Sequence, residues 1–249
     1  MIKRSAFWAL PLATAMALTG CSSGSSPEPS ASLESQAPSA DPSQPAEQSV
    51  GDALSAEEVE SIASQIVEGD KAVQVIGNEQ MQKQLAVAKD ANLPSGIKPE
   101  KCADMNAEYS VTDLTGSVAA TATSSSEAVG KVVQVFSLTD EATRKRVAQA
   151  LTLDDLEDCK TVTIDQGGQE IQAERQILAL DVQAEQSLTM STQMDAGGGQ
   201  ILTSVAVQAL DGNNFVLVTL QTGSQQPAEL AGQAVELADQ AFAEIESVQ

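Results

Sequence analysis

The chain has three cysteines, no histidine and a large excess of carboxylates, and these residue types decide which chemistry it could perform. Without histidine there is no Ser-His-Asp triad, no histidine-containing zinc site and no imidazole general base. A cysteine sulfur can carry a lipid, act as a nucleophile or pair in a disulfide. The positions of Cys21, Cys102 and Cys159 therefore carry most of the chemical information. We assign no catalytic residue, no metal ligand and no cofactor, and we expect a protein that is not an enzyme.

Cys21 directly follows a sequence that is typical of an export signal. Residues 1–20 carry Lys3 and Arg4 near their start, continue with an apolar stretch and end in Leu18-Thr19-Gly20. The apolar stretch is shorter than the ~20 residues that cross a bilayer, so it predicts a cleaved signal peptide. With Cys21, the last residues resemble the lipobox of bacterial lipoproteins, which implies a diacylglycerol thioether on Cys21 and cleavage before it. The alternative is an ordinary secretory signal with a nearby cysteine.

Lipidation would anchor the mature chain to the outer face of the cytoplasmic membrane through Cys21. Two acyl chains are enough for stable anchoring. In that oxidising compartment, Cys102 and Cys159 are expected to form a structural disulfide. A redox-active pair is the alternative, but such pairs usually have C-x-x-C spacing, which these two cysteines lack.

The formal charge of −22 makes nucleic acid an unlikely partner, because such a surface repels phosphates. Acidic residues cluster at 154–158, yet no EF-hand type loop is present, so no calcium site is assigned. Two of the many carboxylates could in principle serve a hydrolase. Aromatic residues make up only 2% of the chain, which leaves few platforms for stacking sugars or bases.

Two segments with different compositions follow the signal. Residues 21–52 comprise Cys21 and a stretch of serine, proline, alanine and acidic residues with almost nothing large and apolar. Such a stretch cannot bury enough surface to offset its ordering entropy, so it predicts a disordered linker. Residues 53–249 suit a single extracytoplasmic domain of ordinary size.

The domain begins with helical patterns and continues with strands. Ser55 and Glu58 form a capping box before an apolar helical stripe. Further helices are expected at 79–89, from about 139 to 151 with an extension over 153–159, and at 227–248. Alternating apolar patterns predict seven strands, at 117–124, 129–138, 160–165, 169–182, 187–195, 200–210 and 214–222.

The fold class expected from this order is α+β, a largely antiparallel β-sheet of about 5–7 strands with helices packed on it, including a C-terminal helix. Cys102 is expected in a loop and Cys159 at a helix end. Lys131 and Arg175 lie on strands beside apolar neighbours, and both are expected on a solvent-exposed face.

The order of motifs resembles the PknH-like extracellular domain over roughly residues 54–248. The matching features are Pro99-x-x-Cys102, a strand pair ending in Phe136, a helix, Cys159 and a late hairpin around Gly212-Asn213. That domain forms the outer sensor region of some actinobacterial Ser/Thr kinases and also occurs alone in lipoproteins. The resemblance implies a solitary α+β domain that binds an unidentified small molecule or wall component, without catalysis. It assigns no ligand-binding residue here.

Three functions remain open from the sequence. The first is a membrane-anchored, non-catalytic ligand-binding or sensor-type module for a small-molecule, lipid or cell-wall ligand. The second is a lipid or glycolipid carrier, suggested by the apolar strand runs at 201–209 and 215–220, although buried core strands would show the same pattern. The third is a carboxylate-based hydrolase.

Overall fold

The computed structural model describes residues 53–249 except for 92–95, 110, 112–113, 127, 155, 167–168 and 196–198. The predicted signal peptide at residues 1–20, the lipidation site Cys21 and the linker at 21–52 lie outside the described residues. Among the described helices, none has the length and apolarity needed to cross a membrane.

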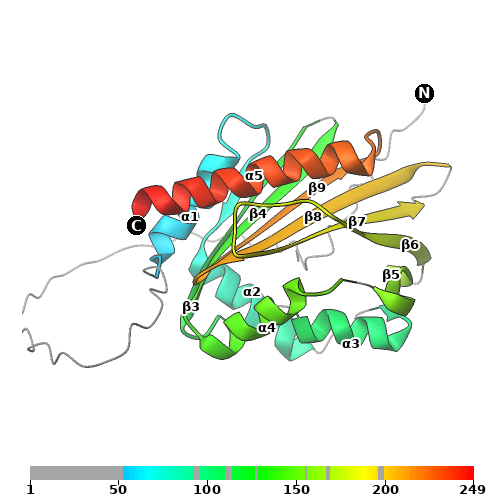
Figure 1. Ribbon diagram of the computed structural model, residues 1–249, viewed down its shortest axis with the longest axis horizontal. Helices are drawn as coiled ribbons and strands as arrows, with labels where there is room; N and C mark the ends of the chain where they lie inside the picture. The colour runs from blue at the N-terminus through cyan, green and yellow to red at the C-terminus, as the bar shows by residue number, and fades with distance from the viewer. Residues whose placement is uncertain are drawn as a thin grey trace, which may run out of the picture. The chain divides into compact units, whose positions relative to one another are not determined.

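An antiparallel sheet of nine strands forms the centre of the domain (Figure 1). Its strand order is β1-β3-β4-β9-β8-β7-β6-β5-β2. The strands are β1 (Gln74–Ile76), β2 (Ile97–Lys98), β3 (Ser117–Ser125), β4 (Val129–Leu138), β5 (Thr161–Gln166), β6 (Gln169–Leu178), β7 (Gln186–Asp195), β8 (Ile201–Asp211) and β9 (Asn214–Thr222).

The expected α+β class is confirmed, but the expected count of 5–7 strands is too low. The seven predicted strands are all present, and the two additional ones are β1 and β2 at the edges of the sheet. These edge strands have three and two residues, respectively. Such short segments show no period-two alternation, which is why the sequence pattern does not reveal them.

Helices α1 (Ala56–Ile66) and α5 (Pro227–Val248) cover one face of the sheet (Figure 1). The Ser55 hydroxyl accepts the Glu58 amide, and the Glu58 carboxylate accepts the Ser55 amide, so the predicted capping box starts α1. Small residues on α5 let this helix pack closely against β8 and β9. The buried side chains of α5 are Leu230, Ala231, Ala234, Ala238, Ala241, Phe242 and Ile245.

The apolar strand runs that suggested a lipid carrier belong to this core. Val205 and Val207 of β8 and Val216 and Val218 of β9 are fully buried against α1 and α5. The interpretation as ordinary core strands therefore accounts for these runs.

The opposite face carries α2 (Asn78–Ala91), α3 (Glu100–Tyr109) and α4 (Glu141–Leu151) (Figure 1). One apolar cluster under α2 and α4 includes Phe136, whose ring centroid lies 5.4 Å from that of Phe215. A second cluster surrounds Cys102 and Cys159 beside β5 and β6. Helices thus cover both faces of the sheet.

The disulfide expected between Cys102 and Cys159 is present, with a Cα–Cα distance of 5.6 Å. Two local predictions around it are wrong. Cys102 lies in α3 rather than in a loop, because this helix already begins at Glu100, directly after Pro99. The helix expected to extend over 153–159 instead ends at Leu151, and a short 3-10 turn, η1 (Glu157–Cys159), carries the second cysteine.

Candidate functional site

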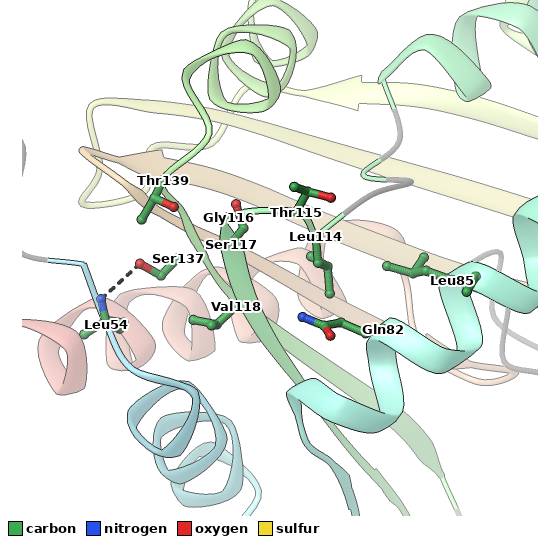
Figure 2. Close-up of a pocket in the computed structure, with 11 residues that line it drawn as sticks. Leu54, Gln82, Leu85, Leu114, Thr115, Gly116, Ser117, Val118, Ser137 and Thr139 are labelled. Atoms are coloured by element: carbon green, nitrogen blue, oxygen red, sulfur yellow. Dashed lines mark hydrogen bonds between the residues drawn. The ribbon is translucent and has the colours of Figure 1, made fainter.

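A pocket with a volume of about 510 Å³ lies where β3 begins, beside α2 and the residue that precedes α1 (Figure 2). Its walls come from four segments that are distant in sequence. The lining residues are Leu54, Gln82, Leu85, Ala86, Leu114, Thr115, Gly116, Ser117, Val118, Ser137 and Thr139.

A tight turn before β3 shapes the pocket. Gly116 has a φ of +67°, a conformation that side chains disfavour, and the Ser117 amide donates to the Leu114 carbonyl at 2.9 Å. This turn brings Leu114, which is only 4% exposed, and Thr115 to the same rim as Ser117.

The pocket wall is mostly apolar. Leu54 and Val118 lie on one side and Leu85 of α2 on the other, with Leu114 between them (Figure 2). The Leu54 amide donates to the Ser137 hydroxyl at 3.0 Å, which fixes the start of the domain against β4. Among the described lining residues none carries a charge, so this pocket suits an uncharged group.

Ser117 is the polar group without a partner in this wall. The residue is 6% exposed, and its buried hydroxyl oxygen has no hydrogen-bond partner within the described part of the chain. Leaving a buried hydroxyl unpaired costs roughly 1–3 kcal/mol. Because this oxygen has almost no surface open to the pocket, a ligand atom can accept its hydrogen bond only after the Ser117 side chain turns toward the pocket. The described lining residues supply apolar contacts and hydroxyl and amide groups.

A second, polar pocket of about 270 Å³ lies at the other end of β3, next to α5. Asp70 and Lys71 from the loop after α1 line it together with Lys131 of β4 and Glu236 of α5. The Lys131 ammonium lies 2.7 Å from the Asp70 carboxylate. Lys131 was expected on a solvent face, but its side chain is only 19% exposed, because the α1–β1 loop folds over it.

Two opposing effects act on the carboxyl pKa of Asp70. Partial burial by itself raises the pKa, whereas hydrogen bonds from Lys131 and Ser124, together with the Lys131 charge, lower it. Together, the hydrogen bonds and the Lys131 charge outweigh the effect of burial, so the pKa of Asp70 lies below its usual value. This pair holds the loop in place at the pocket rim.

The remaining sequence-based candidates lie apart from both pockets. Cys102 and Cys159 are 0% and 5% exposed and are joined to each other. The acidic residues Asp154, Glu157 and Asp158 are exposed near η1, and no group of three metal-ligating side chains occurs within the described ranges. The pocket at the start of β3 was missed because no local motif marks residues that only the fold brings together.

Comparison with known proteins gives distant structural similarity alone. No family model matches the chain, and neither does any curated protein sequence. An uncharacterised protein from Mycobacterium smegmatis is 17% identical, with a TM-score of 0.45 over 79% of this chain and 99% of that one. The extracellular domain of PknH from Mycobacterium tuberculosis is 12% identical, with a TM-score of 0.45 over 78% and 98%. At this sequence identity and TM-score, neither structure indicates a ligand or a ligand-binding residue for this chain.

Proposed function

We propose that this chain is a non-catalytic ligand-binding module of the cell envelope, anchored by a lipid on Cys21 to the outer face of the cytoplasmic membrane. Its ligand site is the pocket at the start of β3. The observation that carries this proposal is the buried hydroxyl of Ser117, which has no hydrogen-bond partner among the described residues, in a wall whose described residues carry no charge.

The ligand is a small molecule with an apolar portion and one hydrogen-bond acceptor. The apolar portion contacts Leu54, Leu85 and Leu114, which line the pocket. The acceptor bonds to the Ser117 hydroxyl once that side chain turns toward the pocket. Satisfying a buried hydroxyl that is already desolvated contributes to affinity without a further desolvation cost on the protein side.

The test is a thermal-shift screen of the purified protein against uncharged cell-wall fragments and neutral lipids. A ligand that binds the folded state stabilises it by about 2.7 kcal/mol at a hundredfold excess over its Kd. We expect at least one compound to raise the Tm of the wild type. Flat melting curves across the whole set would contradict the proposal.

Two matched pairs of variants locate the site. Ser117→Ala removes the pocket hydroxyl, whereas Thr189→Val removes another buried, unpartnered hydroxyl that lies away from the pocket. Ala86→Trp fills the opening from α2, whereas Gln80→Trp places the same ring on an exposed α2 position that does not line it. The ligand shift should fall in Ser117→Ala and Ala86→Trp and persist in the two controls.

A further inference from the structure

Arg175 interrupts an apolar series on β6. Strand alternation places Ile171, Ala173, Arg175 and Ile177 on the same face, which is the face under α2, α3 and α4. The three apolar residues pack against the clusters on that face, while Arg175 is half-buried among them. The expectation that Arg175 lies on an open solvent face is therefore wrong. Arginine is rarely buried at such an inward-facing position unless an opposite charge pairs with it.

The guanidinium of Arg175 has no counter-charge in the part of the chain that the structure describes. Among the described residues, its side chain forms one hydrogen bond, a weak one from Nη2 to the Met190 sulfur at 3.4 Å. The neighbouring Glu174 and Gln176 point to the other face of the sheet, since adjacent residues in a strand alternate. Burial lowers the pKa of the Arg175 guanidinium, and no carboxylate among the described residues opposes that effect.

A polar row crosses the sheet from Arg175. Arg175 lies opposite Thr192 of β7, which lies opposite Ser204 of β8, which in turn lies opposite Gln221 of β9. All four side chains are half-buried, and within the described residues none of the three uncharged ones forms a side-chain hydrogen bond. At about 4.8 Å per strand, the row spans roughly 14 Å.

Apolar residues border this row on both sides. On one side, starting two residues earlier on β6, the neighbouring row consists of Ala173, Met194 and Leu202. On the other side, starting two residues later on β6, it consists of Ile177, Met190 and Ala206. A line of unused donors that ends in a guanidinium, set between two apolar rows, fits an elongated molecule with an acidic end.

We propose that Arg175 is the anion-binding residue of a second ligand site, which takes a molecule with a carboxylate or phosphate group at one end and hydrogen-bonding groups along the row Thr192–Ser204–Gln221. The planar fork of arginine matches both oxyanions through two parallel hydrogen bonds. This site lies on β6–β9, whereas the pocket of the proposed function lies at the start of β3, so the two proposals stand independently.

The experiment titrates the purified full-length protein with inorganic phosphate and, separately, with acetate at constant ionic strength. The readout is the NMR signal of the Arg175 Nε–H group, which must shift as an oxyanion binds. Phosphate and acetate distinguish the two possible acidic groups by which of them binds more tightly. An Arg175 signal that stays unchanged with both anions overturns the proposal.

Variants separate binding from structure. Arg175→Gln should weaken the binding of the tighter anion by roughly tenfold or more, and Arg175→Lys should not restore it, because lysine lacks the fork. The control Lys145→Gln removes an exposed cation from α4 and should leave binding unchanged. Because Arg175 has no counter-charge among the residues whose structure is described, the Tm of Arg175→Gln should equal or exceed that of the wild type. If Arg175→Gln bound the anion as tightly as the wild type, or if its Tm fell by several degrees, Arg175 would have a structural role and the proposal would be overturned.

Discussion

Lys131 Nζ and Ser124 Oγ both donate to the same Asp70 oxygen, Oδ2, each at 2.7 Å. Lys131 is on β4 and Ser124 on β3, where they lie directly opposite each other, while Asp70 comes from the loop after α1. The Ser125 amide also donates to the Lys71 carbonyl in that loop. The Asp70 carboxylate and one backbone hydrogen bond therefore hold this loop against the end of the sheet.

The first prediction concerns Asp70 and pH. The folded-state pKa of Asp70 lies below its ordinary value of 3.8. The ionised carboxylate therefore stabilises the fold in full at pH values above the ordinary pKa. This contribution is lost as pH falls through the lower, folded-state pKa. Asp70→Asn should therefore lower the free energy of unfolding at neutral pH, and the difference from the wild type should shrink at pH values below that folded-state pKa. Urea denaturation across this range measures it.

The control for this titration is Asp104→Asn, which removes an exposed carboxylate of α3. Its stability should follow the wild type at every pH. A pH-independent difference for Asp70→Asn would mean that the carboxylate charge plays no part in holding the loop.

The second prediction concerns the stability of the two hydroxyl variants without ligand. Ser117→Ala and Thr189→Val each remove a buried hydroxyl for which the described residues supply no hydrogen-bond partner. Each variant should be more stable than the wild type by about 1 kcal/mol, because the desolvation cost of the hydroxyl disappears. Chemical denaturation measures the change. A large loss of stability in Ser117→Ala would reveal a structural hydrogen bond and remove the basis for its role in binding.

The long strands and the terminal helix could be predicted because each has a strong, local signal. The helix Pro227–Val248 has its predicted bounds, since proline marks its first turn and its apolar residues form one stripe. The edge strands β1 and β2 could not be predicted, because pairing with β3 and β5 defines them, and those partners are distant in sequence.

The partial burial of Lys131 and Arg175 could not be predicted from the sequence either, for a related reason. Alternation shows which residues share a face but not what covers that face. The loop containing Asp70 covers Lys131, and the apolar clusters on the helix-covered face flank Arg175. The pocket at Ser117 depends on contacts between Leu54, α2 and β3, which no single stretch of sequence contains.

The third prediction concerns the disulfide. Cys102 and Cys159 are 57 residues apart, and closing a loop of this size stabilises a fold by ~4 kcal/mol on the chain-entropy model. The double variant Cys102→Ala, Cys159→Ala should lose stability of this order. Reduction of the wild type should produce a similar loss, since both treatments free α3 from η1. Urea denaturation with and without reductant measures it, and equal stability of the reduced and oxidised wild type would contradict the prediction.

The fourth prediction concerns the anchor. If Cys21 carries a diacylglycerol, mass spectrometry of the protein from its native cells should find a mature chain that begins at a lipid-modified Cys21. Each buried CH₂ group contributes ~0.8 kcal/mol, so two acyl chains hold the chain firmly on the membrane, and Cys21→Ala should move it from the membrane fraction to the soluble fraction. The matched control is the double variant Cys102→Ala, Cys159→Ala, which should stay on the membrane because those sulfurs are joined to each other and buried. An unmodified chain that still begins with residues 1–20 would exclude the lipid anchor while leaving both proposed ligand sites open to their own tests.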